Sequence, residues 1–127
     1  MKDKIPNDIL DKDTVFDKES ALDIFSGDEE LLKELCNIFI NEYPKQIFKI
    51  KAAIEGHNSS ELMKSAHRLK GSAANIGAKE TYNTAHILEA IGKKNNLDDA
   101  EKIYEVLLDN LERLAHELSE YTKSNKA

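Results

Sequence analysis

Apolar residues recur along most of the chain every three or four positions, which is the spacing of one face of an α-helix. The longest such stripe begins after Asp28 and continues to Ile54. It keeps its phase across Pro44, so the pattern predicts one long helix, kinked near this proline, rather than two separate helices. The apolar positions of this stripe are Leu32, Leu35, Phe39, Tyr43, Ile47, Ile50 and Ile54.

The same periodicity predicts four more helices. A short helix is expected from Asp17 to Phe25, a second long one from the cap at Asn58 to the stop at Gly77, and a third over 78–91. A polar turn is expected at 92–96, with Asn96 as the cap of the last helix. The inward positions of these helices are Phe16, Leu22, Phe25, Leu62, Ala66, Leu69, Ala73, Ile76, Tyr82, Ala85, Leu88, Ile91, Tyr104, Leu107, Leu111, Leu114 and Leu118.

No segment alternates with the period of two that marks a β-strand. Four long helices joined by short loops predict an all-α, antiparallel, up-down-up-down four-helix bundle, with the short first helix lying across one end. We interpret residues 1–14 as a polar N-terminal tail or linker, 15–121 as the bundle domain and 122–127 as a polar C-terminal tail.

The composition is typical of a soluble helical protein with charged outer faces. The chain has 127 residues, a net charge of −6, 40% hydrophobic residues and 33% charged residues. The acidic balance argues against nucleic acid or an anionic membrane as the partner, because either would require a basic face. The single cysteine, Cys36, excludes a disulfide framework. With no secretory signal and no apolar run of the ~20 residues that span a bilayer, we expect a cytoplasmic protein.

The histidines do not form the motifs of a metal enzyme. They are His57, His67, His86 and His116, and none lies three residues after a glutamate. The Glu-x-x-His pairs of di-iron bundles and the His-Glu-x-x-His of zinc proteases are both missing, which weakens the hypothesis of a metal-dependent bundle enzyme. We expect His57 in a loop, His116 beside the core stripe and His86 in a local hydrogen bond.

His67 differs from the other histidines in its surroundings. It follows Ala66, so it lies at the edge of the apolar stripe. Helical side chains lean toward the N-terminus, so the residue four positions later normally covers the turn from which a side chain emerges. That residue is Gly71, which leaves the imidazole open, and Lys70 and Lys64 lie on the same face. An open imidazole beside ammonium groups is what a phosphoryl-accepting nucleophile requires.

Two structural explanations compete with this interpretation. A histidine beside an apolar stripe is often simply packed against its neighbours. Gly71 could instead allow two helices to approach each other closely. The residue pattern by itself leaves the functional and the structural explanations open.

The segment SAHRLKGSAANIGA at 65–78 resembles the signature of histidine-containing phosphotransfer (HPt) domains. The family pattern is alanine-histidine-x-leucine-lysine-glycine, followed by small residues and a glycine. The likeness extends from about Phe16 to Leu118 and includes the Ser-Gly-Asp-Glu-Glu turn at 26–30 and Pro44. It also falls on the second long helix of the expected bundle, which is where the family carries it.

The resemblance implies that His67 is the phosphoryl acceptor, with Lys70 as the lysine of the pattern and Gly71 as the glycine that clears the approach. The family position that holds the other imidazole nitrogen is often glutamine and here falls on Glu89. Counted from the turn at Gly77, His67 lies 10 residues before and Glu89 12 after, which leaves an offset of about 3 Å in an antiparallel hairpin. A carboxylate there would accept a hydrogen bond from Nδ1 and leave Nε2 free to attack. The alternative is that Glu89 is an exposed helix charge.

The resemblance further implies a phosphorelay protein of two-component signal transduction, which carries a phosphoryl group on His67 between aspartates of response-regulator receiver domains. Receivers and a hybrid sensor histidine kinase are the expected partners of a monomeric chain. It has no nucleotide site, so we expect no kinase activity of its own, no cofactor and no bound metal; the Mg²⁺ used in transfer would belong to the receiver. The alternative is an HPt-like helical adaptor that binds receivers without carrying phosphate. Candidates for the docking patch are Ile24, Phe25, Leu31, Met63, Lys64 and Arg68.

Overall fold

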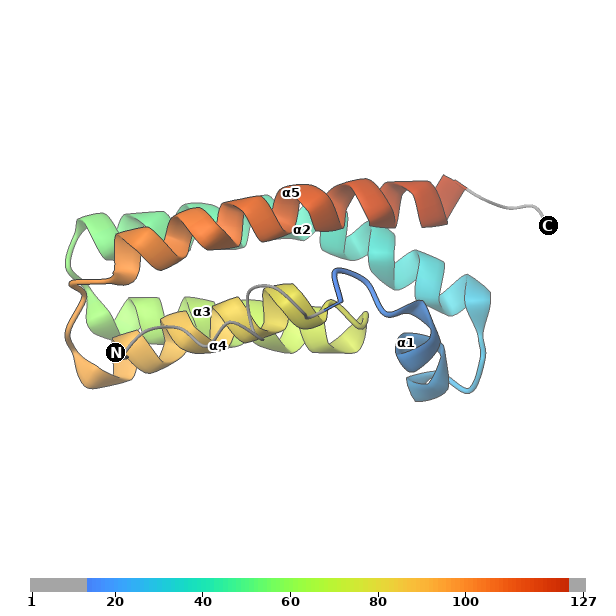
Figure 1. The fold of residues 1–127 in the computed structure, drawn as a ribbon, viewed down its shortest axis with the longest axis horizontal. Coiled ribbons are helices and arrows are strands. Elements are labelled where there is room, and N and C mark those ends of the chain that lie inside the picture. The colour runs from blue at the N-terminus through green and yellow to red at the C-terminus, as the bar shows by residue number, and fades with distance from the viewer. Residues whose placement is uncertain (1–13, 124–127) are drawn as a thin grey trace.

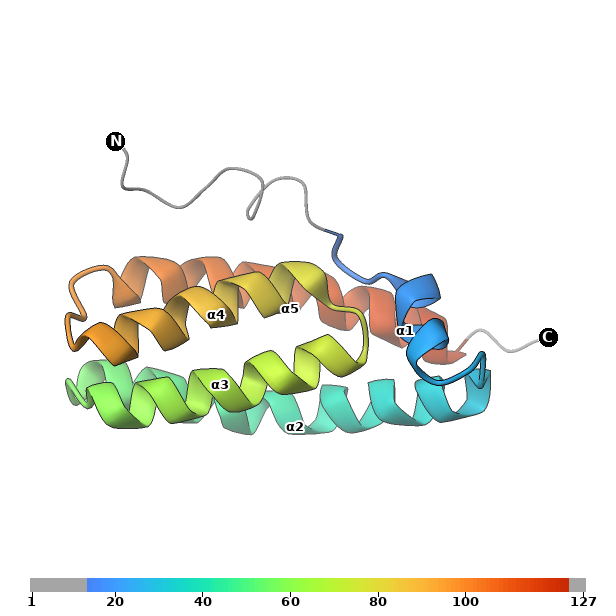
Figure 2. The same ribbon diagram turned by 90° about the horizontal axis from the view of Figure 1, so that it is seen from below.

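A computed structural model describes residues 14–123 and folds them into five helices without a strand. The helices are α1 (Lys18–Ile24), α2 (Glu29–Glu55), α3 (Ser59–Asn75), α4 (Lys79–Lys94) and α5 (Ala100–Lys123). The long helices pack in a closed square, α2 on α3, α3 on α4, α4 on α5 and α5 on α2. Consecutive long helices run antiparallel, and α1 lies beside the end of the bundle at which α3 turns into α4 (Figures 1 and 2). The predicted all-α bundle with a short additional helix is confirmed.

Polar caps start the first three helices where the sequence predicts them. Asp17, Asp28 and Asn58 each accept a hydrogen bond from the backbone N–H three residues later, at 3.0–3.1 Å. Hydrogen bonds from the Ser20 backbone and from Lys79 hold the pKa of Asp17 at about 2. Each cap satisfies one of the N–H groups that a helix start leaves without an intrahelical partner.

The helix α2 continues through Pro44, as the unbroken phase of its stripe predicts. Proline removes one backbone N–H from the helix and crowds the preceding turn, which favours a bend. Figure 1 shows the axis of α2 changing direction partway along its length.

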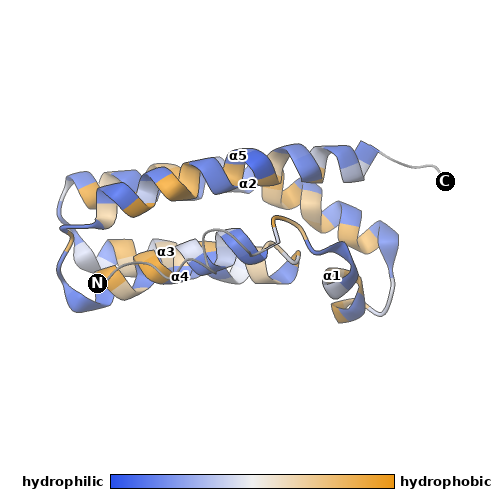
Figure 3. Ribbon diagram, viewed as in Figure 1, coloured by the Kyte–Doolittle hydropathy of each residue, from blue (hydrophilic) through white to orange (hydrophobic). Residues whose placement is uncertain are grey.

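The predicted apolar stripes meet in one core. All the inward positions predicted for α3 and α5 are buried, and those of the other helices are buried or half-buried. Figure 3 shows hydrophobic positions recurring between polar ones along the helices. Each fully buried leucine contributes about 1.5–3 kcal/mol of transfer free energy, so packing rather than helix propensity holds the bundle together. Cys36 belongs to this core, and burial raises the pKa of its thiol to about 12.

The turn between α4 and α5 differs from the prediction. The helix α4 does not stop at Ile91 but runs to Lys94, and Asn95 ends it in the left-handed conformation at φ 58°. Gly92, predicted in a polar turn, lies inside the helix and is buried. Asn96 does not cap α5, which starts only at Ala100; its side chain instead accepts a hydrogen bond from the N–H of Asp98, at 3.1 Å.

The segment before α1 ties the first helix to the α3–α4 turn. The N–H of Asp17 donates to the carbonyl oxygen of Gly77 at 2.8 Å, and the N–H of Glu80 donates to that of Thr14 at 3.0 Å. Gly77 has φ +72°, a conformation that favours glycine.

The predicted tails at 1–14 and 122–127 fall mostly outside the described residues, so their boundaries stay predictions. Over residues 14–123, no helix has both the length and the hydrophobicity needed to cross a bilayer.

Candidate functional site

His67 stands on the outer face of α3. Its side chain is 66% exposed, while the preceding residue, Ala66, is fully buried. The imidazole therefore lies at the edge of the core stripe, as its place in the sequence predicts, and a large partner can reach it. The alternative of a simply packed histidine is wrong.

Glu89 of α4 holds the inner side of this ring. Its side chain is only 7% exposed, and its Oε2 lies 2.8 Å from Nδ1 of His67. The tight turn at Gly77 brings the two helices into the register that places these residues opposite each other, as the residue count predicts. The alternative of an exposed helix charge at Glu89 is wrong.

Lys70 occupies the other oxygen of the same carboxylate. Its Nζ lies 2.6 Å from Oε1 of Glu89, and the lysine side chain is only 17% exposed. Burial of Glu89 opposes ionisation, but the hydrogen bonds and charges of Lys70 and His67 together outweigh it, so the pKa of Glu89 falls below its ordinary value of 4.5. The ionised carboxylate therefore stabilises the fold fully above about pH 4.5, and this contribution is lost as the pH falls through the lowered folded-state pKa.

The charge on Glu89 determines which nitrogen of His67 is the nucleophile. An ionised carboxylate can only accept a hydrogen bond, so the neutral ring places its proton on Nδ1 and donates it to Glu89. The lone pair then lies on Nε2, the nitrogen on the far side of the ring from Glu89. The arrangement is suited to nucleophilic attack by Nε2 on an electrophile brought by a partner.

A second imidazole joins this cluster, which the sequence analysis did not predict. His86 stacks on Tyr82 with ring centroids 6.5 Å apart, and its Nδ1 accepts from Nζ of Lys70 at 3.4 Å. The same nitrogen lies 3.9 Å from Oε1 of Glu89. We expected a local hydrogen bond to explain His86, because Tyr82 and Glu89 neighbour it on its helix; both contacts are present, but the hydrogen bond comes from Lys70 of α3.

The space above Gly71 is open. A Cβ built at this residue would meet no other atom within 4 Å, and the residue is exposed. Gly71 therefore does not serve close contact between helices, so that alternative is wrong. Its position one turn after His67 leaves the approach to the imidazole clear.

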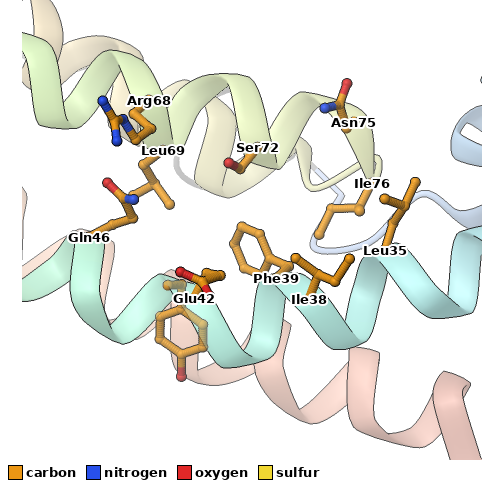
Figure 4. Close-up of a pocket in the computed structure, with 11 residues that line it drawn as sticks. Leu35, Ile38, Phe39, Glu42, Gln46, Arg68, Leu69, Ser72, Asn75 and Ile76 are labelled. Atoms are coloured by element: carbon orange, nitrogen blue, oxygen red, sulfur yellow. The ribbon is translucent and has the colours of Figure 1, made fainter.

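A groove runs between α2 and α3 beside this face (Figure 4). Its buried lining residues are apolar and most of its exposed ones are polar, and Arg68, the residue after His67, lies on its α3 side. Ile38 is half exposed on the opposite wall and was not among the predicted docking residues. The residues that line it are Leu35, Ile38, Phe39, Glu42, Tyr43, Gln46, Arg68, Leu69, Ser72, Asn75 and Ile76.

The predicted docking residues do not all form one patch. Ile24 and Leu31 are exposed and Phe25 half-buried where α1 meets the start of α2, near the groove. Lys64 is exposed on α3, one turn before Arg68. Met63 is half-buried one helical turn before His67, about 20 Å along α3 from the turn that contacts α1, and its backbone lies against Gly92. It belongs to the α3–α4 contact.

We expect nitrogen NMR, recorded at an alkaline pH at which the ring is neutral, to find His67 in a single tautomer with the proton on Nδ1. Glu89→Ala removes the acceptor, so the variant should show both tautomers. Comparing the ¹⁵N shifts of the two ring nitrogens in the two proteins checks this. Equal tautomer populations in the unaltered protein would contradict the assigned bond.

Comparison with known proteins agrees with this geometry. Residues 34–117 match the family model of the Hpt domain, and this span contains His67, Lys70, Gly71 and Glu89. The chain belongs to the Hpt domain family. Its sequence is 25% identical over 109 residues to the phosphorelay intermediate protein rdeA of Dictyostelium discoideum, with 86% of this chain and 43% of that protein aligned. The chain thus spans less than half the length of this relative.

Two solved structures share the fold. The histidine-containing phosphotransfer protein B (HptB) of Pseudomonas aeruginosa PAO1 superposes with a TM-score of 0.81 at 17% identity, covering 88% of this chain and 97% of that one. The HPT domain of a sensor hybrid histidine kinase from Shewanella superposes with a TM-score of 0.79 at 18% identity, covering 89% and 97%. At these identities the likeness establishes the bundle fold.

Proposed function

We propose that this chain is a histidine phosphotransfer protein of a two-component phosphorelay and carries a phosphoryl group on Nε2 of His67. The observation that carries the proposal is an exposed imidazole whose Nδ1 is held by a buried, ionised carboxylate, beside the open space over Gly71. Membership of the Hpt family and the likeness to a phosphorelay intermediate protein support it. The proposed partners are receiver domains and a hybrid sensor histidine kinase, met by a monomer in the cytoplasm.

The transfer step follows from the geometry of the ring. The lone pair of Nε2 attacks the phosphorus of a receiver's aspartyl phosphate, the N–P bond forms, the P–O bond to the aspartate breaks, and the aspartate leaves as a carboxylate. The ring keeps its proton on Nδ1 and becomes positively charged as Nε2 gives up its lone pair. The Glu89 carboxylate, which is itself only 7% exposed and lies 2.8 Å from Nδ1, stabilises that charge. The reverse step returns the group to the next aspartate.

The protein supplies position and charge rather than covalent steps of its own. Phosphoryl transfer depends mainly on in-line placement and on neutralising the charge of the transferred group. Lys70 contributes in two ways. Its ammonium keeps Glu89 ionised, and it places a positive charge at the edge of the site, where charge on the transferred group is neutralised. The Mg²⁺ used in transfer would be held by the receiver. The groove between α2 and α3 offers apolar surface on which a receiver can dock so that its aspartate reaches His67.

The direct test is to incubate the purified chain with receivers that carry a ³²P-labelled aspartyl phosphate. We expect label to pass to this chain and to show the stability of a phosphohistidine, which is lost in acid and kept in alkali. Incubation with labelled ATP alone should give no label. Receivers that bind the chain without transferring label would instead indicate the non-phosphorylated adaptor and would overturn the proposal.

Lys70→Ala should slow transfer without abolishing it. The change removes a charged hydrogen bond, which is worth about 1.5–3 kcal/mol net, so the rate should fall roughly 10- to 100-fold while the nucleophile remains. Rapid-quench measurement of label transfer checks the rate. Lys102→Ala, which removes the same charge from an exposed position on α5, is the control and should transfer normally. Wild-type transfer by Lys70→Ala would remove Lys70 from the mechanism.

A further inference from the structure

The helices α3 and α4 form the most extensive pairing in the bundle, and they meet in a regular series of contacts. Reading along α3, Ser59 hydrogen-bonds Asn95, Met63 lies against Gly92, His67 bonds Glu89 and Lys70 bonds His86. Successive contacts are three or four residues apart on each helix, which is about one helical turn. The contact at Gly92 is therefore the immediate neighbour of the contact between Glu89 and His67.

At Gly92 the two backbones approach more closely than a side chain would permit. A Cβ on this residue would lie 2.7 Å from the backbone nitrogen of Met63 and 2.8 Å from the carbonyl oxygen of Ser59. Both atoms belong to the backbone of α3, so no rotamer change can relieve the overlap. Reaching ordinary van der Waals contact near 3.4 Å from the nearer atom, at 2.7 Å, would require the helices to separate here by about 0.7 Å. Any larger residue thus sets a wider spacing between α3 and α4.

This separation of the helices is large compared with the range of lengths that the hydrogen bond one helical turn away can adopt. The contact between Nδ1 of His67 and Oε2 of Glu89 measures 2.8 Å, and hydrogen bonds of this kind span about 2.7–3.2 Å. The other oxygen of Glu89 binds Lys70 at 2.6 Å, and Lys70 also lies on α3, so both bonds of the carboxylate cross the contact between α3 and α4 and both lengthen when the helices separate. An outward shift of α4 at Gly92 would therefore stretch or break the bond that orients His67.

We propose that Gly92 is a positioning residue for phosphoryl transfer: its missing side chain sets the α3–α4 spacing at which Glu89 can hold Nδ1 of His67. Gly92 touches neither the imidazole nor the partner and acts through Glu89. The proposal rests on the proposed function in taking His67 as the phosphoryl acceptor. The orientation of the ring itself, however, can be measured without any receiver or phosphate.

The test is the ¹⁵N NMR tautomer measurement on Gly92→Ala, combined with transfer kinetics. We expect the variant to show both neutral tautomers of His67 and to transfer roughly tenfold more slowly, like Glu89→Ala. The receiver concentration at half-maximal rate should stay unchanged, because the groove between α2 and α3 is untouched. In the double variant Glu89→Ala/Gly92→Ala, the second change should cost nothing further, because it acts only through the bond already lost.

Gly27→Ala is the control, because Gly27 lies between α1 and α2, outside the contact of α3 with α4, and its φ of +79° disfavours a side chain although a Cβ there would meet nothing within 4 Å. It should lower stability yet keep the single tautomer. Wild-type tautomer populations in Gly92→Ala, or additive losses in the double variant, would overturn the proposal. If Gly92→Ala does not fold, Glu89→Asp tests the same spacing by withdrawing the carboxylate about 1.5 Å, one bond length; a single tautomer in that variant would equally overturn it. If Gly92→Ala alters the tautomer of His67 but the unaltered protein accepts no phosphoryl group, the proposed function is contradicted while the effect of Gly92 on the ring stands.

Discussion

His67→Gln will accept no phosphoryl group from a labelled receiver, while its helicity and melting temperature stay close to those of the unaltered protein. The amide of glutamine has no nucleophilic lone pair comparable with that of Nε2, so the loss of transfer is complete. The fold survives because the imidazole is 66% exposed and contributes little to the core. Removing it affects one hydrogen bond to Glu89, which the glutamine amide can replace in part, so we expect a change in unfolding free energy below about 1 kcal/mol.

The controls for this variant are the other imidazoles. His86→Gln alters the neighbouring histidine of the same cluster, and His116→Gln alters an exposed histidine on α5. Both should still acquire label. Label retained by His67→Gln but lost from His86→Gln would move the acceptor to His86. An unfolded His67→Gln would show that the residue has a structural role that its exposure does not suggest.

The part of the site that depends on helical periodicity and one tight turn could be predicted from the sequence. The edge position of His67 follows from the stripe in α3, and the pairing with Glu89 follows from counting residues on either side of Gly77. Both predictions depend only on local geometry, because a helix advances by a constant rise per residue and a short turn fixes the register of a helical hairpin. The geometry also decides between alternatives that the pattern left open, since only burial distinguishes a held carboxylate at Glu89 from an exposed one.

The other features of the fold and the site depend on which helix surfaces pack together. The spacing of apolar residues along one helix does not encode that pairing. The stretch Gly92-Lys93-Lys94-Asn95-Asn96 has the composition of a turn, yet contact with α3 buries its glycine and extends the helix to Lys94. Close helix packing was considered as an alternative for Gly71, which is open, but not for Gly92, which was assigned to a turn and needs it. Nη1 of Arg113 donates to both carboxylate oxygens of Glu80, at 2.7 and 2.9 Å, and this ion pair joins residues 33 apart in the chain, so it left no local signal.

Gly71→Gln will fold with normal or higher stability and still lose most phosphotransfer, although His67 is intact. Glycine in a helix interior is less favourable than other residues by about 0.5–1 kcal/mol, and a Cβ at Gly71 meets nothing within 4 Å. Replacing it should therefore raise the melting temperature by about 2–5 °C. The glutamine side chain leans toward the turn that carries His67 and fills the space through which a receiver aspartate must approach.

Gly71→Ala separates the two effects of this substitution. It brings the same gain in helix stability but adds only one methyl group, so it should keep much more transfer than Gly71→Gln. A thermal melt and a transfer assay on both variants are sufficient, and the nitrogen NMR of His67 should show the unaltered tautomer in each, because Glu89 remains in place. A destabilised Gly71→Gln would mean that this face of α3 packs against another part of the protein, and a stable variant with undiminished transfer would mean that the receiver reaches His67 from another direction.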